Sequence, residues 1–534
     1  MPTFEKRVIP YTETGLFSKL IVDYLQEAAA VRDFYHRPDR LESYADQIRE
    51  KSENYSDYHR KTLVAALEVQ YQGFELTEAV RTNLTALRES HTFTVTTGHQ
   101  LSLFTGPLYF VYKIVSAINT AKALQVQYPD YQFVPVYWMA TEDHDFEEIS
   151  SLVTNKGKLK WQKEAQGAVG RLDTAGLEQI AKLLESEFNT GKNAQEIAHL
   201  FKKVYLQETS LAAATRLLVN TLFGDTGLII VDGDDRALKQ LFVPNVEREL
   251  FEQFSFKAVS QTNEKLKSYS VQVNPREINL FYLTSGLRNR IVKEEQRFRV
   301  VDTDIVFTET ELRNELQEFP ERFSPNVILR PLYEEVILPN LVYIGGAGEL
   351  AYWLQLKSMF EAVGVTFPIL KLRNAAVVLQ RKQFQKIERL QLEINDLLRS
   401  VTDLSNRVAI QSADFPLSLD RERAVIESTF AHLEGLIART DKSFAGAVAA
   451  QKKKQLNGLD KLEKRLLLAQ KRKSADEIVR ALALRQFVFP FNQFQERILN
   501  FSVFYAEFGA AFIDTLLQEF EPFKSELAVF IADT

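Results

Sequence analysis

Apolar residues recur at three- and four-residue spacing over the first 90 residues, as in LIVDYLQEAAAVRDFY and RKTLVAALEVQYQGF. This spacing places them on one face of a helix and predicts amphipathic helices. From residue 91 the pattern changes to a β-branched run, HTFTVTTGHQ, then to LYFVYKIVSAINTAKAL with helical spacing, and then to the apolar run FVPVYWMA. A strand, a helix and a second strand predict a βαβ unit and hence a parallel sheet.

Further strands are expected at 227–233, 341–346 and 365–372, with helices and a hairpin-like region between them. Such alternation is typical of doubly wound α/β folds. We therefore predict a Rossmann-like doubly wound parallel sheet over residues 91–378. Inserted connecting segments are expected at about 150–225 and 240–325, and residues 1–90 are expected to form a helical segment that packs on this core.

From about residue 380 apolar residues alternate steps of three and four, which is the seam of a coiled coil. One seam runs from Phe384 to Val408 and a second from Ile426 to Leu466, with the break SADFPLSLD between them. Two long helices joined by a short break predict an antiparallel α-helical coiled-coil arm over residues 379–475. Residues 476–534 are rich in Phe and are expected to form helices that return to the core.

Composition narrows the class of protein. The 534 residues carry a net charge of -6 and include no Cys. The lack of Cys excludes disulfides, iron–sulfur clusters, Cys-based zinc sites and a thiol nucleophile, and the acidic balance argues against a nucleic-acid binder. The N-terminus MPTFEKRVIP has no apolar core, and no uncharged apolar run approaches 18 residues. We expect no signal peptide, no membrane association and a cytoplasmic location.

Gly98, His99 and Gln100 lie between the first core strand and its helix. Ligands of open α/β sheets bind outside the carboxyl ends of the strands. Gly98 would let a phosphate approach the backbone, and His99 and Gln100 would donate hydrogen bonds to its oxygens. The alternative is a strand-end histidine whose hydrogen bonds are satisfied by a neighbour.

A second polar cluster, Glu142, Asp143, His144 and Asp145, follows the second strand of the same βαβ unit. These residues could bind a substrate ammonium group, position a general base or hold a divalent metal. The alternative is a solvated loop. A zinc site is disfavoured because Cys is absent and the chain has seven His, only two of which fall in these clusters.

Later strands are followed by further candidates for substrate binding. A glycine-rich turn suits close backbone contact with a ligand, although it lacks the GK[ST] ending of a P-loop. Two cations at a strand end suit a carboxylate or phosphate. The alternatives are a tight turn and a surface loop. The candidates are Arg330, Glu335, Gly345, Gly346, Gly348, Glu349, Tyr352, Lys371, Arg373 and Asn374.

A basic stretch runs from Lys452 to Lys473 within the predicted arm. A charge run on a coiled coil is usually its solvated face. Binding of phosphate groups is the alternative.

Four segments, TTGHQLSLFTGPLYFVYK, VPVYWMATEDHDFEEI, LRPLYEEVILPNLVYIGGAGELAYW and FPILKLRNAAVVL, resemble the cysteine-adding enzyme family of bacillithiol biosynthesis. The resemblance covers nearly the whole chain. It implies a ligase that joins L-cysteine by an amide bond to the glucosamine amine of glucosaminyl-malate, in the last step of bacillithiol biosynthesis. It also implies a Rossmann-like core and a coiled-coil arm that forms a homodimer.

The segment around His99 is also similar in placement to the HIGH motif of class I aminoacyl-tRNA synthetases. It departs from that motif because it has one His where HIGH has two, and no KMSKS-like segment is present. Direct transfer of an adenylate mechanism from that family is therefore not supported by the motif. Lys371 and Arg373 are the residues that could supply the missing cations.

On this hypothesis the carboxyl group of cysteine is activated as an adenylate or a phosphate, with ATP and magnesium as the expected cofactors. The sugar amine must attack in its neutral form, so a base is needed, and Asp143, His144 and Asp145 are the candidates. His99 and Gln100 would stabilise the activated phosphate.

The remaining charged candidates would bind the substrates. Arg330 or Arg373 would pair with the malyl carboxylates, and Glu349 with an ammonium group. Two alternatives stay open: a metal-assisted hydrolase or transferase that uses the cluster at 142–145, and a non-enzymatic coiled-coil protein that binds nucleic acid through the basic stretch.

Overall fold

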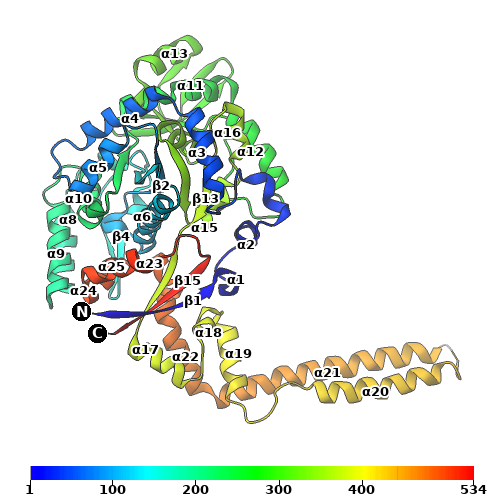
Figure 1. Ribbon diagram of the computed structural model, residues 1–534. Helices are drawn as coiled ribbons and strands as arrows, with labels where there is room; N and C mark the ends of the chain where they lie inside the picture. Colours follow the sequence, from blue (N-terminus) through cyan, green and yellow to red (C-terminus); the bar gives the residue numbers. More distant parts are fainter. Residues whose placement is uncertain (1, 442, 534) are drawn as a thin grey trace. The chain divides into compact units, whose positions relative to one another are not determined.

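The computed structural model describes residues 2–441 and 443–533. The chain divides into two compact units. The first holds residues 1–12, 16–377 and 495–534, and the second holds residues 13–15 and 378–494. The first unit contains the sheets and the helices around them, and the second contains a long helical hairpin (Figure 1).

A five-stranded parallel sheet forms the centre of the first unit, in the order β13-β12-β2-β3-β6. The chain runs outward from β2 through β3 to β6 and then crosses to β12 on the other side of β2. The strand order therefore reverses between β2 and β12, which is where doubly wound sheets bind ligands. The strands are β2 (Thr92–His99), β3 (Gln132–Met139), β6 (Ile229–Asp232), β12 (Asn340–Gly345) and β13 (Ile369–Leu372). The predicted Rossmann-like parallel sheet is confirmed.

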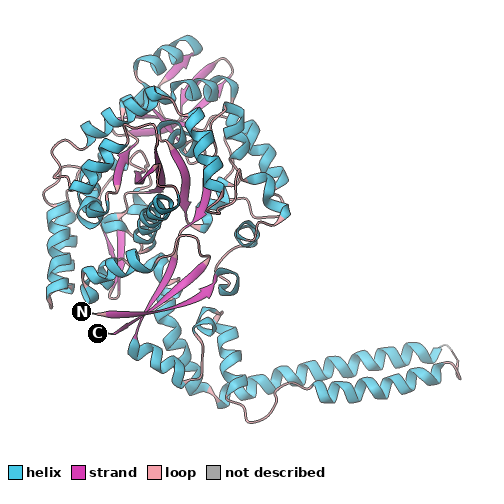
Figure 2. Cartoon of the chain, viewed as in Figure 1, coloured by secondary structure: helices cyan, strands magenta, loops and turns pink. Residues whose placement is uncertain are grey.

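Apolar packing explains why the strands read as continuous hydrophobic runs. Phe93 of β2 and Leu341 of β12 belong to one buried cluster with Ala117 of α6 (Tyr109–Gln127) and Tyr44 of α3 (Ser43–Asn54). Strands of a parallel sheet are covered on both faces, so both sets of side chains are apolar. Helices surround the strands of this unit on the sides visible in Figure 2.

The N-terminal segment differs from the all-helical prediction. Residues Thr3–Pro10 form β1, which pairs antiparallel with β15 (Glu526–Asp533), and β14 (Ala375–Gln380) lies on the other side of β15. The last residues are therefore not helical either. A strand of this kind is stabilised by a partner more than 500 residues away, so local periodicity carries no signal for it.

Helices fill the N-terminal segment after β1. Two of them begin at side-chain caps, because Ser56 accepts a hydrogen bond from the His59 amide and Thr77 accepts one from the Val80 amide. The elements are α1 (Tyr11–Thr14), α2 (Lys19–Leu25), η1 (Ala29–Phe34), α3, α4 (Asp57–Gln70) and α5 (Glu78–Ala86).

Two insertions interrupt the core. The first follows β3 and contains α7 (Phe146–Ile149), β4 (Ser151–Thr154), β5 (Gly157–Lys160), η3 (Val169–Arg171), α8 (Leu177–Glu187), α9 (Lys192–Tyr205), α10 (Leu211–Phe223) and η4 (Gly224–Thr226). The second follows β6 and contains α11 (Arg236–Glu252), α12 (Phe254–Lys265), β7 (Leu280–Thr284), β8 (Leu287–Glu294), β9 (Arg297–Val300), β10 (Val306–Thr308), α13 (Glu309–Glu318), η5 (Pro320–Arg322), β11 (Phe323–Pro325) and α14 (Arg330–Ile337). Its strands form an antiparallel sheet in the order β10-β9-β8-β7-β11.

The rest of the first unit consists of short helices. These are η2 (Leu103–Thr105), α15 (Ala347–Trp353), α16 (Lys357–Val363), α23 (Gln495–Ile498), α24 (Ser502–Phe508) and α25 (Ala510–Glu519).

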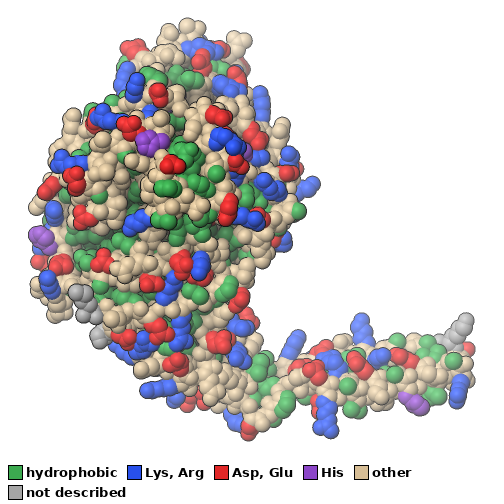
Figure 3. Space-filling view, in the orientation of Figure 1, with side chains coloured by type: hydrophobic (Ala, Val, Ile, Leu, Met, Phe, Trp, Pro, Cys, Tyr) green, Lys and Arg blue, Asp and Glu red, His purple; other side chains and the backbone are tan. Residues whose placement is uncertain are grey.

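The second unit contains an antiparallel hairpin of two long helices, α20 (Asp420–Ile437) and α21 (Ser443–Lys473). Arg423 of α20 pairs with Asp460 of α21, and Glu434 pairs with Lys452, so the helices run in opposite directions. The predicted antiparallel coiled-coil arm is confirmed, but the position of its turn is wrong, because the hairpin forms within the second seam and not at the break SADFPLSLD. Basic and acidic side chains alternate along the visible face of this hairpin (Figure 3).

The first seam is divided among short helices instead of forming one long helix. Gln391 has a positive φ of 53°, which a continuing helix does not allow. Glu393 and Ser400 then begin two new helices as caps. The short elements of this unit are α17 (Arg381–Arg389), α18 (Ile394–Leu398), α19 (Val401–Gln411), α22 (Ala475–Val488) and η6 (Pro490–Asn492). None of the helices in the described ranges has the length and hydropathy needed to cross a bilayer.

Candidate functional site

The carboxyl ends of the five parallel strands meet at one edge of the sheet, which we call the carboxyl edge. It is formed by residues 98–100 after β2, 140–145 after β3, 232–234 after β6, 345–349 after β12 and 373 after β13. Most of the predicted site residues lie here, as expected for strand-end positions in parallel neighbours.

A buried ion pair lies where the strand order reverses. Lys113 of α6 contacts both carboxylate oxygens of Glu349, with Nζ to Oε1 and Oε2 distances of 2.7 and 2.8 Å, and also donates to the Gly98 carbonyl. Glu349 accepts further hydrogen bonds from the Gly346 amide at 2.7 Å and the Tyr343 hydroxyl at 3.1 Å. The ammonium partner of Glu349 is thus supplied by the protein itself.

This pair is only partly closed to solvent. The Lys113 side chain is 2% exposed, whereas the Glu349 side chain is 30% exposed. Burial acts to raise the pKa of Glu349, but Lys113 outweighs it and holds the pKa below the usual value. Sequence reasoning missed Lys113, although a single lysine in the apolar helical run LYFVYKIVSAIN is a signal for a buried, paired cation.

His99 ends β2 and presents a hydrogen-bond acceptor. Its Nδ1 lies 2.8 Å from the Gln100 carbonyl oxygen, which can only accept, so Nδ1 carries the proton of the neutral ring. Burial and the nearby Lys113 lower the pKa of His99 to about 4. The ring is therefore neutral at pH 7, and its Nε2 can accept a hydrogen bond but cannot donate one to a phosphate.

Arg373 lies beside the same pair. Its Nη1 donates to the Asn374 carbonyl at 2.9 Å, its Nη2 pairs with Glu496, and the guanidinium lies 5.3 Å from the Tyr109 ring centroid. Its buried Nε has no hydrogen-bond partner in the described part of the chain. Since an ideal Cβ built on Gly346 would lie 3.8 Å from it, this donor faces the glycine turn.

The neighbours of Arg373 have structural partners. Lys371 pairs with Asp39 at 2.7 Å and lies over the Phe523 ring. The Asn374 side chain accepts from the Ser116 hydroxyl at 3.1 Å and donates to the Glu521 carbonyl at 2.9 Å. Of the three candidates in this segment, Arg373 alone keeps a donor without a partner among the described residues.

Asp143, after β3, lies between two arginines. Arg330 of α14 is 3.6 Å from its Oδ2, and Arg288 of β8 is 3.9 Å from its Oδ1. Burial acts to raise the pKa of Asp143, but the two guanidiniums lower it to about 2. Asp143 is therefore a carboxylate at neutral pH and a weak base. Sequence reasoning missed Arg288, since its strand belongs to an insertion far away in sequence.

His144 presents a donor. Arg288 Nη1 lies 2.7 Å from His144 Nδ1, and because arginine only donates, the proton of the neutral ring is on Nε2. Burial and Arg288 lower the pKa of His144. His99 and His144 follow neighbouring strands, yet one exposes an acceptor and the other a donor.

The other members of this cluster have partners within the protein. Glu142 is buried and pairs with Lys239 of α11, and Asp145 caps α7 by accepting from the Glu148 amide at 3.1 Å. The Gln100 amide nitrogen donates to Asp143 at 3.2 Å and to Glu148 at 2.8 Å. Gln100 therefore positions Asp143, and its donors are already used.

Helix α14 places its two glutamates at opposite edges. Glu335 pairs with Lys51 at 2.9 Å and accepts from Asn340, at the amino ends of the strands. The prediction that Glu335 lies at the binding edge is therefore not supported. Glu334 lies there instead, with its Oε2 3.8 Å from an ideal Cβ on Gly98, and its buried Oε1 has no partner in residues 2–441 and 443–533. Burial raises the pKa of Glu334 well above its usual value.

The glycines of the turn after β12 have different reasons to be glycine. A Cβ on Gly345 would lie 2.7 Å from a Leu350 methyl group, whereas one on Gly348 would meet open space and one on Gly346 would make ordinary contact. Gly345 is therefore needed for packing. Tyr352, one turn into α15, is half-buried, and burial raises its pKa.

Asp232 and Asp234, after β6, complete the carboxyl edge and were missed. Burial and the Asp234 charge raise the pKa of Asp232 to about 6. Asp234 forms a bidentate pair with Arg171 at 2.7 and 2.8 Å. The acidic run DGDD directly after the apolar run GLIIV is the sequence feature that could have indicated these two aspartates. Throughout the described ranges, no group of three or more His, Cys, Asp or Glu side chains is placed to hold a metal ion.

Comparison with known proteins agrees with the fold. Residues 4–374 match the sequence model described as "Bacillithiol biosynthesis BshC, N-terminal Rossmann-like domain", and residues 376–531 match "Bacillithiol biosynthesis BshC, C-terminal coiled-coil domain". A protein of Flavobacterium johnsoniae named "Putative cysteine ligase BshC" is 48% identical, with 97% of this chain and 98% of that protein covered. Proteins with the same name from Christiangramia forsetii, 48% identical with 99% of each chain covered, and Cytophaga hutchinsonii, 37% identical with 98% of each covered, are also similar. The chain belongs to the bacillithiol biosynthesis BshC family.

Proposed function

We propose that this protein is a ligase that adds L-cysteine, through an amide bond, to the glucosamine amine of glucosaminyl-malate in bacillithiol biosynthesis. The observation that carries the proposal is the whole-length match to relatives named as cysteine ligases. The carboxyl edge supports it, since it combines cations for carboxylates with a neutral acceptor for an amine.

The carboxyl edge offers separate groups for the two substrates. Arg330 keeps about 20% of its side chain exposed and is bound only loosely to Asp143, so it can pair with a malyl carboxylate. The His144 Nε2–H is a further donor for an oxygen atom. His144 follows β3, and Arg330 of α14 contacts Asp143 in the same segment, which supports binding of the acid part of the sugar substrate at the end of β3.

The amine is oriented by the acceptor side of the edge. Amide formation joins the amine nitrogen to the carboxyl carbon of cysteine, and the nitrogen loses a proton as the bond forms. His99 Nε2 is the acceptor for that N–H, because its tautomer leaves the lone pair open. Asp143, with a pKa of about 2, is a weaker candidate for the base than the sequence suggested.

ATP with magnesium remains the proposed source of carboxyl activation, because a free carboxylate has no adequate leaving group. Magnesium is usually held by substrate phosphates and one or two carboxylates. Most carboxylates of the carboxyl edge are paired with cations, so the phosphates of ATP would supply most of the magnesium ligands. Arg373 Nε is the donor of this chain that would face the negative charge. ATP, when bound, supplies the leaving group.

The homodimer belongs to the same proposal. Apolar side chains of the α20–α21 hairpin are exposed, among them Val425 at 63%, Leu462 at 56% and Leu468 at 54%. A second chain would cover such surface, and sedimentation velocity of the full-length protein checks this. The cytoplasmic location expected from the sequence stays a prediction.

The test is a mass-spectrometric assay of purified protein with glucosaminyl-malate and cysteine, with and without ATP and magnesium. We expect the amide product only with ATP, together with AMP or ADP. Arg330→Gln should raise the KM for glucosaminyl-malate by about tenfold or more, whereas Arg299→Gln, which removes an exposed pair with Glu294, should not. Absence of product from folded protein under every condition would contradict the proposal.

The two alternatives have less support. Two of the four residues needed for a metal-assisted hydrolase, Glu142 and Asp145, already have structural roles. The basic stretch lies on a hairpin where Lys452 pairs with Glu434, and Lys473 lies 3.9 Å from Asp414, so its charge is partly neutralised. Metal analysis and salt-dependent binding to RNA or DNA test these alternatives.

A further inference from the structure

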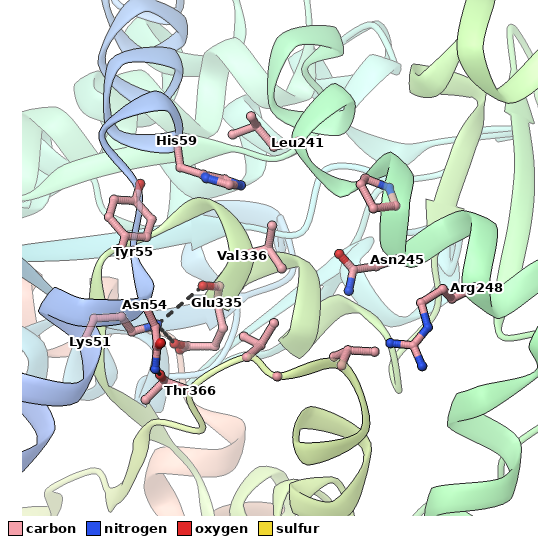
Figure 4. A pocket seen from close by; sticks show the side chains of 14 residues that line it. Lys51, Asn54, Tyr55, His59, Leu241, Asn245, Arg248, Glu335, Val336 and Thr366 are labelled. Carbon is pink, nitrogen blue, oxygen red and sulfur yellow. Dashed lines mark hydrogen bonds and ion pairs between the residues drawn. The ribbon is translucent and has the colours of Figure 1, made fainter.

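A cavity of about 310 Å³ lies at the other edge of the parallel sheet, near the amino ends of β12 and β13 (Figure 4). Its walls come from α3, α4, α11, the last turn of α14 and residues 363–366. Val336 lies four residues before β12, and Thr366 lies three residues before β13. Since β12 has six residues, the cavity and the carboxyl edge are separated by about 20 Å of strand.

Much of the wall of the cavity is apolar. Leu241, Val336, Val363 and Val365 line it, and Figure 4 shows Leu241 and Val336 on the same side as the His59 ring. Taking about 30 Å³ for each water molecule, the volume corresponds to about ten waters. The cavity therefore suits a compact molecule of roughly ten non-hydrogen atoms with a hydrocarbon part.

Two donors come from α11, on the same helix face as Leu241. Asn245 and Arg248 are three residues apart and so lie on one face of the helix. Arg248 donates from Nε to Glu252 at 3.1 Å and from Nη1 to the Ala362 carbonyl at 3.1 Å. Its Nη2 and the Asn245 side-chain amide have no hydrogen-bond partner in the described part of the chain.

The remaining polar groups of the cavity add no net charge. Lys51 and Glu335 neutralise each other at 2.9 Å, and the dashed lines in Figure 4 mark their contact. Burial lowers the pKa of His59, so its ring is uncharged at neutral pH. The Asn54 amide is bound to the Thr366 hydroxyl at 3.0 Å. Arg248 is the cation available to a ligand, because its ion pair with Glu252 is exposed to solvent and therefore weak.

We propose that this cavity binds a small monocarboxylic acid with a short branched hydrocarbon body. One carboxylate oxygen accepts from Arg248 Nη2 and the other from the Asn245 amide, while the hydrocarbon lies against Leu241 and Val336. A guanidinium and an amide on one helix face match the two oxygens of a carboxylate. Arg248 is the single cation offered to the ligand and it also contacts Glu252, so the site favours a singly charged acid over a dianion.

Isothermal titration of the full-length protein with 4-methylpentanoate tests the proposal, with the uncharged 4-methylpentanamide as the matched control ligand. We expect saturable one-site binding of the acid with a Kd of about 1 mM or tighter. The amide should bind about tenfold or more weakly, because it lacks the charge that Arg248 recognises. Equal binding of the acid and the amide overturns the proposal. So does the absence of acid binding at a concentration about ten times the expected Kd.

Variants place the binding in this cavity. Arg248→Gln and Val336→Trp should each weaken binding of 4-methylpentanoate by about tenfold or more, the first by removing the cation and the second by filling the space. Arg236→Gln, at an exposed arginine of the same helix that pairs with Glu321, should bind as the unchanged protein does. Thermal unfolding shows whether each variant is folded.

A loss of binding in folded Arg248→Gln supports the proposal, and unchanged binding in both cavity variants overturns it. Because the readout is binding of an acid that is not a substrate of the proposed ligase, failure here is distinguishable from failure of the ligase reaction.

Discussion

Two buried lysine–glutamate pairs lie at opposite edges of the same parallel sheet. Lys113 and Glu349 lie at the carboxyl edge, and Lys51 and Glu335 at the amino edge. The Lys51 and Glu335 side chains are 3% and 0% exposed, whereas Glu349 keeps 30% of its surface exposed. The same chemistry thus serves two purposes, because a closed pair only holds helices together and a half-open pair can also contact a ligand.

The neighbours of each pair strengthen this contrast. Two groups with unused hydrogen-bonding capacity lie beside the half-open pair: the His99 Nε2 and the Arg373 Nε. The closed pair is satisfied by Asn340, which donates to Glu335. Unused hydrogen-bonding capacity beside a partly exposed ion pair is what distinguishes a candidate site from a structural one.

The largest effect is expected at the half-open pair. Lys113→Met removes a cation from the proposed reaction centre and leaves Glu349 without its partner. The specific activity of the folded variant should fall by about 100-fold or more, in addition to a loss of stability of about 3–5 kcal/mol. The measurements are product formation by mass spectrometry and urea denaturation. If folded Lys113→Met kept full activity, the carboxyl edge would not be the reaction centre.

At the closed pair the effect should be confined to stability. Lys51→Met leaves Glu335 buried without a counter-ion, and the free energy of unfolding should fall by about 3–5 kcal/mol. The double variant Lys51→Met, Glu335→Gln should recover part of this loss, since the buried charge is removed. Activity per folded molecule should stay within about twofold. A large loss of activity in the folded double variant would show that the two edges are coupled.

The pH dependence of stability separates His99 from an ordinary surface histidine. Its pKa is about 4 in the folded protein and about 6.5 in the unfolded chain. As the pH falls from 6.5 to 4, the unfolded chain binds a proton that the folded protein does not bind, so stability decreases, by about 3 kcal/mol in total. Urea denaturation at pH 7, 5.5 and 4.5 should show a smaller decrease for His99→Asn.

The matched control is His199→Asn, at an exposed position of α9. It should keep the acid sensitivity of the unchanged protein. Identical pH dependence in the His99 and His199 variants would mean that the His99 ring is not held neutral.

The smallest effect tests the same contrast between two aspartates after β3. Asp145→Ala removes the cap of α7 and should cost about 0.5–1 kcal/mol, with activity within about twofold. Asp143→Asn, which weakens the contacts to Arg288 and Arg330, should lower activity by about tenfold or more. Equal loss of activity in both variants would contradict their assignment to different roles.

Part of the site was predictable because strand ends can be read from periodicity. His99, Asp143, Gly345 and Arg373 each follow an apolar run, and parallel strands bring such ends together. Their individual roles were not predictable. The tautomer of His99 depends on the position of one carbonyl oxygen.

Adjacent residues of a helix show the limit most clearly. Glu334 and Glu335 have the same chemistry, but successive helical residues point about 100° apart. Only the packing of α14 decides that Glu334 faces Gly98 and Glu335 faces Lys51. Composition and spacing are the same for both, so the sequence pattern favours neither.

The sequence by itself determined the parallel core, the helical arm and the edge where polar residues gather, because these follow from local periodicity and from the geometry of parallel strands. Tertiary structure alone decided the pairing of β1 with β15, the point where the hairpin turns and the partners of Lys113 and Arg288. Each of these depends on contacts between segments that are far apart in the sequence. Such contacts form only in the folded chain, so local patterns do not predict them.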